Sequence, residues 1–468
     1  MKITFYGAAR GVTGSKHLIT TNGYNILLDC GLHQGRRHDA YELNKTLPFN
    51  VADIDAVILS HAHADHCGAL PMLIKQGYQQ KILATRATID ISYLIMMDSA
   101  KIQEMDYRNL LIYGRAEDKP LEPLYSPEDI DLIAPHWQSV EYQRDVNQWT
   151  MLNDQCGCKL YDAGHILGSA ITVVKIQENG QIKTLAYSGD LGNTQVPILP
   201  EPELIVEEVE TLIIECTYGD KNHSPIDDVS RKLKEIITDA VKHKKKIIVP
   251  AFALGRTQEL IYILHKLYQQ KAIPVIPIYL DSPLASKITT SYSNHLDDFD
   301  QQSREDFLND HVSPFAFSNL KTVETVEDSR GLADSDGPYM VIASSGMAEG
   351  GRVLHHLARN ISDPQTVVLI TGYQAEETLG RKLQDGLSPV SIYGKTHEVK
   401  AHIVSLDALS AHADQTGLLT YIQNTKGLKR VFLVHTELPK AEAFQKLLAE
   451  RLPELEVIIP KVGDSFDI

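Results

Sequence analysis

Short apolar runs mark the N-terminal part of the chain as strands. Two of them, residues 17–20 and 25–28, flank the Asn22-Gly23 pair and predict a tight hairpin. A further apolar run, residues 56–59, predicts a buried strand. The chain therefore begins with paired strands.

Helical and strand patterns alternate from there on. Residues 86–150 have mostly helical spacing, with breaks at prolines. Later, residues 226–245 predict an amphipathic helix and residues 246–251 a buried strand, and residues 255–268 and 275–280 repeat that order. This alternation predicts a parallel sheet flanked by helices. Further strands are predicted over residues 339–343, 366–370, 391–393, 401–404 and 430–434.

Length and composition narrow the class of protein. A chain of 468 residues predicts two or three domains. The net charge of −16 argues against attraction of nucleic acid by the protein as a whole, although bound metal ions can dominate the field at a site. No apolar run is long enough for a bilayer, so no membrane partner is expected. Five scattered cysteines and an N-terminus without a signal pattern favour the cytoplasm.

One segment carries a dense set of potential metal ligands. His61, His63, Asp65 and His66 fall within six residues, directly after the predicted strand 56–59. Imidazole and carboxylate groups together suit zinc or a similar divalent ion. His61 and His63 alternate and can face one ion, while Asp65 and His66 are offset and can face a second. A polar loop that is rich in histidine by chance is the weaker interpretation.

Single polar residues recur at the ends of other predicted strands. Taken alone, each is compatible with an ordinary turn or strand-end residue. Together with the segment 61–66 they supply enough nitrogen and carboxylate ligands for two neighbouring metal ions. The inserted α/β segment separates the last two histidines from the others, so we expect a cleft between two domains. The single polar residues at strand ends are Asp29, His165, Asp190, Glu215, His412 and His435.

The order of the motifs resembles that of a known family. His61-Ala-His63-Ala-Asp65-His66 is similar to the metal signature of the metallo-β-lactamase fold. Residues 27–31, 164–165, 188–190, 215–219, 250–258, 281–285, 345–347, 410–414 and 434–435 also resemble motifs of its β-CASP subgroup, in the same order. The likeness covers nearly the whole chain. Members of this subgroup resemble the endonuclease subunit of the pre-mRNA 3′-end cleavage factor and its bacterial and archaeal relatives.

The resemblance implies an α/β fold in three segments. A metallo-β-lactamase αββα sandwich would be built from residues 1–220 and 389–468, and residues 221–388 would form an inserted β-CASP α/β domain with a mainly parallel sheet.

The resemblance also implies a role for each site residue. His61, His63 and His165 would hold one zinc ion, Asp65, His66 and His435 the other, and Asp190 would bridge them. Asp29 would support the histidines, and Glu215 would orient His412, which would contact the scissile phosphate or protonate the leaving oxygen. The loop Ser345-Gly346-Met347, with Arg352 and His412, would hold substrate phosphate, although a plain strand-to-helix turn explains that loop equally well.

The implied activity is hydrolysis of single-stranded RNA by a hydroxide shared between two Zn²⁺ ions, giving 5′-phosphate and 3′-hydroxyl products. Mn²⁺ or iron fits the same ligands. A histidine at position 435 is typical of the RNA-processing members. The alternatives are a hydrolase of DNA or of another phosphoester, and a metal-binding partner subunit without activity. The choice between endonuclease and exonuclease, and the existence of a homodimer, stay open.

One departure from the family pattern lies beside a ligand. Relatives commonly have glycine after the last metal histidine, whereas this chain has Thr436. A threonine there is expected to narrow the site or change the turn.

Overall fold

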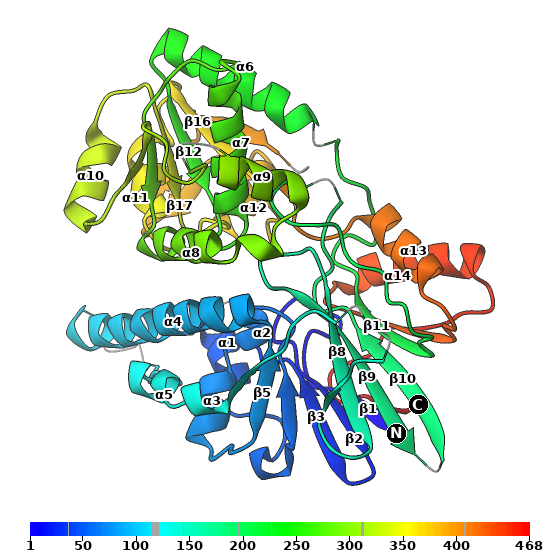
Figure 1. The fold of residues 1–468 in the computed structure, drawn as a ribbon. Helices are drawn as coiled ribbons and strands as arrows, with labels where there is room; N and C mark the ends of the chain where they lie inside the picture. The colour runs from blue at the N-terminus through cyan, green and yellow to red at the C-terminus, as the bar shows by residue number, and fades with distance from the viewer. Residues whose placement is uncertain are drawn as a thin grey trace. The chain divides into compact units, whose positions relative to one another are not determined.

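The computed structural model describes the chain except at positions 36, 114–120, 144, 146, 179, 195, 226, 310–312 and 407–408 (Figure 1). The chain divides into two compact units. The first comprises residues 1–194, 201–222 and 412–468, and the second comprises residues 195–200 and 223–411.

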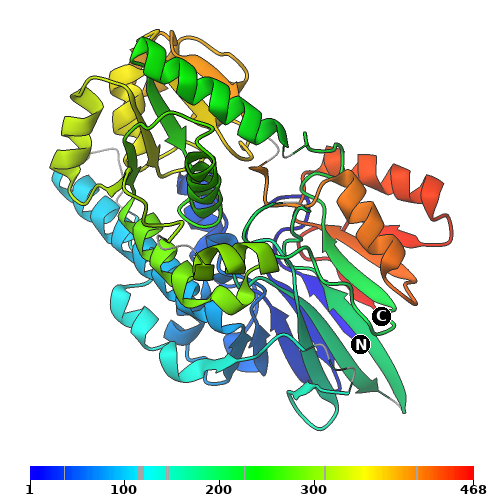
Figure 2. The same ribbon diagram turned by 45° about the horizontal axis from the view of Figure 1, so that its top comes forward.

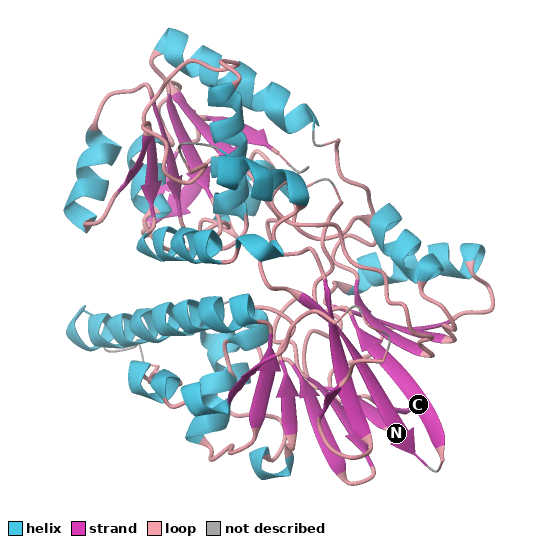
Figure 3. Cartoon of the chain, viewed as in Figure 1, coloured by secondary structure: helices cyan, strands magenta, loops and turns pink. Residues whose placement is uncertain are grey.

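The first unit contains two seven-stranded sheets (Figure 3). Within them, β3 pairs in parallel with β4, and β11 pairs in parallel with both β10 and β20. One sheet has the order β22 (Ser465–Asp467), β1 (Lys2–Phe5), β2 (His17–Thr21), β3 (Tyr24–Leu28), β4 (Ala56–Ile58), β5 (Lys81–Ala84), β6 (Trp137–Ser139). The other has the order β21 (Glu456–Ile458), β20 (Arg430–Val434), β11 (Thr211–Glu215), β10 (Gln181–Tyr187), β9 (Ala170–Glu178), β8 (Cys156–Asp162), β7 (Thr150–Met151).

Apolar side chains from both sheets fill the space between them. Phe5 from one sheet and Phe432 from the other have ring centroids 5.0 Å apart, and Val174 lies in the same buried cluster. This cluster is the sandwich core, and burial of its apolar surface is the main stabilising term of the unit.

Helices cover the outer faces of the two sheets. The first sheet packs against α3 (Leu70–Lys75), α4 (Arg86–Tyr113) and α5 (Pro127–Asp131). The second sheet packs against α13 (Gln415–Asn424) and α14 (Leu438–Arg451), which Figure 2 shows in orange and red. The predicted αββα sandwich is confirmed. The remaining short helices are α1 (Arg37–Asn44), η1 (Val51–Asp53), α2 (Ala64–Cys67) and η2 (Ala134–His136).

The helical pattern expected over residues 86–150 ends earlier than predicted. Residues of β6 and β7 are extended, because Trp137 pairs with Ile82 of β5 and Thr150 pairs with Cys158 of β8. Pairing with a neighbouring strand thus overrides the local periodicity at these two short sheet edges. Among the helices in the described ranges, none is both long enough and apolar enough to cross a bilayer.

The second unit is built on a six-stranded sheet in which every pair is parallel. This confirms the parallel sheet that the strand–helix alternation predicts. Its order is β14 (Leu320–Thr322), β13 (Ile278–Asp281), β15 (Tyr339–Ala343), β12 (Lys246–Pro250), β16 (Thr366–Ile370), β19 (His402–Ser405).

The other elements of this unit are α6 (Asp227–His243), α7 (Arg256–Gln269), α8 (Pro283–Asn294), η3 (Leu296–Asp298), α9 (Gln301–Asn309), α10 (Val326–Asp334), α11 (Val353–Asn360), α12 (Leu379–Gln384) and the hairpin β17 (Val390–Ile392) and β18 (Lys395–His397).

The segment 389–411 lies in the second unit, because β19 pairs with β16 and extends the parallel sheet. The sequence instead predicts that this segment belongs to the metallo-β-lactamase part. An apolar strand pattern of this kind suits a sheet of either unit. Only the pairing with β16 determines which sheet the strand joins.

A buried carboxylate ties the sheet of the second unit to its helices. Asp281, at the end of β13, is fully buried and accepts from Arg352 at 2.7 Å, from His356 at 2.7 Å and from Ser329 at 2.5 Å. Burial opposes ionisation of this carboxyl, but the hydrogen bonds outweigh it and lower the pKa of Asp281 below its ordinary value of 3.8.

We predict that Asp281→Asn lowers the free energy of unfolding by about 3 kcal/mol at pH 7, because it removes the charge opposite Arg352 and replaces one acceptor oxygen by an N–H₂ group that faces other donors. Because the folded pKa is depressed, the stabilisation is complete above pH 4 and disappears as the pH falls through the folded pKa. Urea unfolding of wild type and variant from pH 7 to about pH 2 measures how the difference in their free energies of unfolding narrows.

The matched control is Asp385→Asn, which removes an exposed ion pair with Arg381 and is expected to cost less than about 1 kcal/mol. Equal effects of the two substitutions at pH 7 would contradict the role assigned to Asp281.

Candidate metal centre

The segment that carries the dense ligand set forms a tight loop and one helical turn. His61 follows β4, and His63 precedes α2, which contains Asp65 and His66. The loop after β3 packs directly onto this turn, since the Cys30 and Leu32 N–H groups donate to carbonyls of α2. A Cβ atom at Gly31 would lie 1.5 Å from the Asp65 carbonyl oxygen, so only glycine permits this approach.

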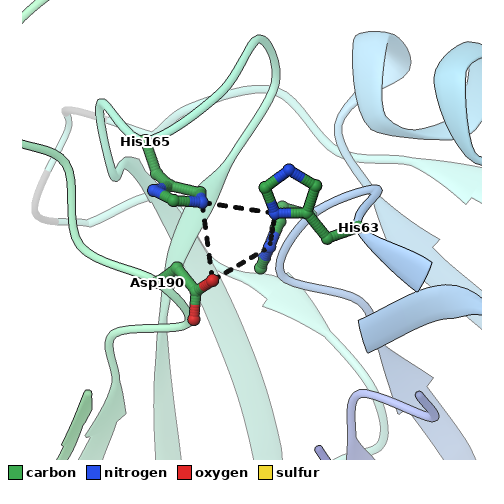
Figure 4. A group of neighbouring side chains, drawn as sticks. His63, His165 and Asp190 are labelled. Atoms are coloured by element: carbon green, nitrogen blue, oxygen red, sulfur yellow. Dashed lines mark hydrogen bonds and ion pairs between the residues drawn. The ribbon is translucent and has the colours of Figure 1, made fainter. Parts of the chain in front are cut away.

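Three histidines and one aspartate converge on a first point (Figure 4). His63 Nδ1 lies 3.1 Å from His61 Nε2 and 3.3 Å from His165 Nε2. Asp190 Oδ2 lies 3.4 Å from both His61 Nε2 and His165 Nε2. These residues come from the loop after β4, the loop after β8 and the loop after β10, so the sandwich brings distant segments together.

A second group lies on the other side of the Asp190 carboxylate. Asp65 Oδ2 lies 3.3 Å from His435 Nε2 and 3.9 Å from His66 Nε2. Asp190 Oδ1 lies 3.3 Å from His66 Nε2 and 3.6 Å from His435 Nδ1. The two oxygens of Asp190 thus face two different ligand groups.

The chemistry of these residues fits bound divalent cations. His66 Nε2 and Asp190 Oδ1 are buried and have no hydrogen-bond partner within the described residues, although they face each other. A shared positive ion would satisfy both atoms, whereas an apolar environment would not. Burial and the neighbouring His61 lower the pKa of His63 to about 3, so its imidazole is neutral and can coordinate.

Hydrogen bonds behind the histidines fix their orientation. His66 Nδ1–H donates to Asp29 at 2.7 Å, and the same carboxylate accepts from the Ser60 hydroxyl at 2.8 Å and from the Tyr187 hydroxyl at 2.6 Å. Asp29 and His435 both have positive φ, 61° and 51°, a conformation that costs of order 1–3 kcal/mol. The surrounding packing holds both residues in place despite this cost.

A histidine–carboxylate pair lies beside the first group. His412 Nδ1 is 2.8 Å from Glu215 Oε1, and Glu215 is fully buried and also accepts from the Leu191 and Thr217 N–H groups. Burial disfavours the charged imidazole, but the Glu215 carboxylate outweighs it and raises the pKa of His412. His412 Nδ1 is also 4.0 Å from Asp190 Oδ2.

Three family models match the chain. They are the metallo-beta-lactamase superfamily domain over residues 18–196, the Beta-Casp domain over residues 257–383 and the Zn-dependent metallo-hydrolase RNA specificity domain over residues 396–460.

Several curated relatives match the chain along its whole length, among them the following two. Ribonuclease TTHA0252 of Thermus thermophilus is 36% identical, with 100% of both chains covered. Transcription termination factor FttA of Methanocaldococcus jannaschii is 30% identical, covering 100% of this chain and 72% of the relative.

This chain belongs to the β-CASP family. A crystal structure of a protein of unknown function from Enterococcus faecalis V583 has the same fold, with a TM-score of 0.52, 12% identity and 99% of each chain covered. That likeness concerns the fold alone.

The structure brings ten of the predicted site residues of this β-CASP protein together in the first unit. They are Asp29, His61, His63, Asp65, His66, His165, Asp190, Glu215, His412 and His435. Their roles as ligands, acid and positioning groups stay predictions. Thr436 is fully buried, and its hydroxyl donates to the Glu437 carbonyl at 3.2 Å.

Four of the predicted phosphate-binding residues lie in the second unit, and the fifth, His412, lies in the first. Ser345, Gly346 and Met347 form the loop after β15. The Arg352 guanidinium donates to Asp281 and to the carbonyls of Val323 and Glu324, at 2.7, 2.9 and 2.7 Å respectively. These contacts engage Arg352 in the fold of this unit, which weakens the case for it as a phosphate ligand.

Tyr187 is a site residue that the sequence pattern does not predict. Its hydroxyl donates to Asp29 and lies 2.9 Å from Ser15 Oγ. Burial and the Asp29 carboxylate raise the pKa of Tyr187, so the hydroxyl keeps its proton and acts as a donor. A single tyrosine at the end of a strand has no pattern that distinguishes it from a core residue.

We predict that Tyr187→Phe weakens metal binding by roughly tenfold, because Asp29 loses a donor and His66 is held less firmly. Competition with a chromogenic chelator measures the affinity.

The control for this prediction is Tyr78→Phe, which removes a buried hydroxyl that donates to the Lys81 carbonyl, outside the residues of the metal centre. Wild-type metal affinity in Tyr187→Phe, or an equal loss in both variants, would contradict the prediction.

Proposed function

We propose that this chain is a metal-dependent ribonuclease that hydrolyses single-stranded RNA to 5′-phosphate and 3′-hydroxyl products. The observation that carries the proposal is the placement of Asp190, whose two oxygens face two ligand groups while the pair His412–Glu215 lies beside them. The names of the relatives, a ribonuclease and a transcription termination factor, support RNA as the substrate.

Two Zn²⁺ ions are the proposed cofactors, and Mn²⁺ or iron suits the same ligands. His61, His63 and His165 would hold one ion, Asp65, His66 and His435 the other, and Asp190 both. Bound there, such ions acidify water and neutralise charge on phosphoryl oxygens.

The side chains of the protein supply the proton transfer. Glu215 accepts from Nδ1–H of His412, which fixes the imidazole and favours its charged form. Nε2 of His412 then donates a proton to the departing 3′ oxygen, which leaves as a hydroxyl group. Glu215 is a positioning residue in this scheme, because it acts through His412.

Substrate binding, cellular location and oligomeric state complete the proposal. The loop Ser345-Gly346-Met347 is proposed to bind substrate phosphate through backbone N–H groups. The cytoplasm is the proposed location, in keeping with five free, buried cysteines. A homodimer stays a prediction, which light scattering of the purified protein decides.

We predict that His412→Ala lowers the rate of RNA cleavage by roughly 10²- to 10⁴-fold while the metal content stays that of the wild type, because the variant loses the acid and keeps the ligands. The assay uses one end-labelled single-stranded RNA and its DNA counterpart with metal-loaded protein. Product lengths then separate internal from terminal cleavage.

The control is His402→Ala, which removes an exposed histidine from β19 in the second unit and should leave the rate unchanged. If fully loaded wild type cleaves neither polymer, the ribonuclease proposal fails and a small phosphoester becomes the substrate to test. If His412→Ala cleaves RNA at the wild-type rate, the acid role is wrong.

A further inference from the structure

An exposed phenylalanine lies at the carboxyl edge of the parallel sheet in the second unit. Phe252 follows β12 and is 36% exposed, although β12 itself and Ala251 are largely buried. A single exposed apolar side chain is common on protein surfaces, so the meaning of Phe252 depends on its place in the fold.

The position of Phe252 coincides with a topological switch point. The chain leaves β12 through α7 toward β13, on one side of β12. It leaves β16, the neighbour on the other side, toward β19, which lies farther out in the opposite direction. In open α/β sheets, ligands bind outside the carboxyl ends of strands where the connections diverge in this way.

The phenylalanine ring lies near two glycines, and at Gly346 it occupies space that a side chain would need. A Cβ atom on Gly346, in the loop after β15, would lie 2.6 Å from Cδ2 of Phe252. A Cβ atom on Gly372, in the loop after β16, would lie 3.9 Å from Cε2. The Cδ2–Cε2 edge of the ring therefore rests against backbone, and a side chain at position 346 would displace it.

The loops that carry the ring are held by side-chain hydrogen bonds. The Thr257 hydroxyl donates to the Phe252 carbonyl at 2.7 Å. The Gln374 amide donates to the carbonyls of Gly346 at 3.0 Å and of Gly372 at 3.2 Å, and so links the two glycine loops. A fixed aromatic ring loses little conformational entropy when a ligand stacks on it.

We propose that Phe252 is a stacking platform for one nucleobase of the RNA substrate. This inference rests on the proposed ribonuclease function and adds a base-binding subsite to it. Stacking on a phenyl ring accepts every base, because each base has a π-face, so the subsite would contribute affinity and not sequence preference. The adjacent loop 345–347, proposed above to bind phosphate, would hold the backbone of the same nucleotide.

The test measures binding of a fluorescein-labelled single-stranded RNA by fluorescence anisotropy, with metal removed by chelator so that the RNA stays intact. A series of RNAs carries one abasic ribonucleotide at each position in turn. The proteins are wild type, Phe252→Leu, Phe252→Trp and the control Tyr393→Leu, which removes an exposed aromatic ring from the turn between β17 and β18. Thermal unfolding shows that each variant is folded.

For the wild type, an abasic site at one position should weaken binding roughly 5- to 150-fold. Phe252→Leu should weaken binding of intact RNA by the same factor and lose its sensitivity to that abasic site. Phe252→Trp should behave as the wild type, because it restores an aromatic face, and so should Tyr393→Leu.

Two results would overturn the inference. The first is that Phe252→Leu binds intact RNA with the affinity of the wild type. The second is that Phe252→Leu binds more weakly but its affinity depends on the position of the abasic site (the abasic profile) as in the wild type, which would indicate a purely structural role. Cleavage of intact RNA by metal-loaded wild type is measured in parallel. If cleavage occurs and the abasic profile is flat, the subsite is wrong and the ribonuclease proposal stands; if cleavage does not occur, the ribonuclease proposal itself fails.

Discussion

The carboxylate of Asp190 is the constraint on which the rest of the site depends. One oxygen faces His61 and His165 at 3.4 Å, and the other faces His66 at 3.3 Å. A buried carboxylate among buried imidazoles is costly unless cations or hydrogen bonds compensate it. The fold supplies the hydrogen bonds behind the histidines, through Asp29 and Tyr187, and leaves the inward-facing atoms to the proposed ions.

The αββα architecture explains why residues so far apart in sequence meet. In the second sheet, β10, β11 and β20 run parallel, so their carboxyl ends lie at one edge of the sheet and bring Asp190, Glu215 and His435 together. In the first sheet, β3 and β4 also run parallel, so Asp29 and the loop with His61 follow them at the same edge of that sheet. The second unit repeats the arrangement with a parallel sheet of its own, where Phe252 and the loop 345–347 follow neighbouring strands.

Local pattern predicts a large part of this molecule. The proposed ligands His61, His63, Asp65 and His66 are recognisable because four suitable residues follow a buried strand within six positions. His165, Asp190 and His435 have no local pattern beyond a strand end, and their roles come only from the family resemblance. The segment 389–411, the strands β6 and β7, and the contacts of Arg352 escape such reasoning, because each depends on pairing with residues far away in the chain.

The most direct test of the account is the origin of the oxygen in the product. RNA is cleaved by metal-loaded protein in H₂¹⁸O, and the ends of the products are analysed by mass spectrometry. Hydrolysis at the proposed centre predicts one ¹⁸O atom in each new 5′-phosphate, a 3′-hydroxyl on the other fragment, and no cleavage after chelation. Products with a 2′,3′-cyclic phosphate and an unlabelled 5′-hydroxyl, formed equally well without metal, would contradict it.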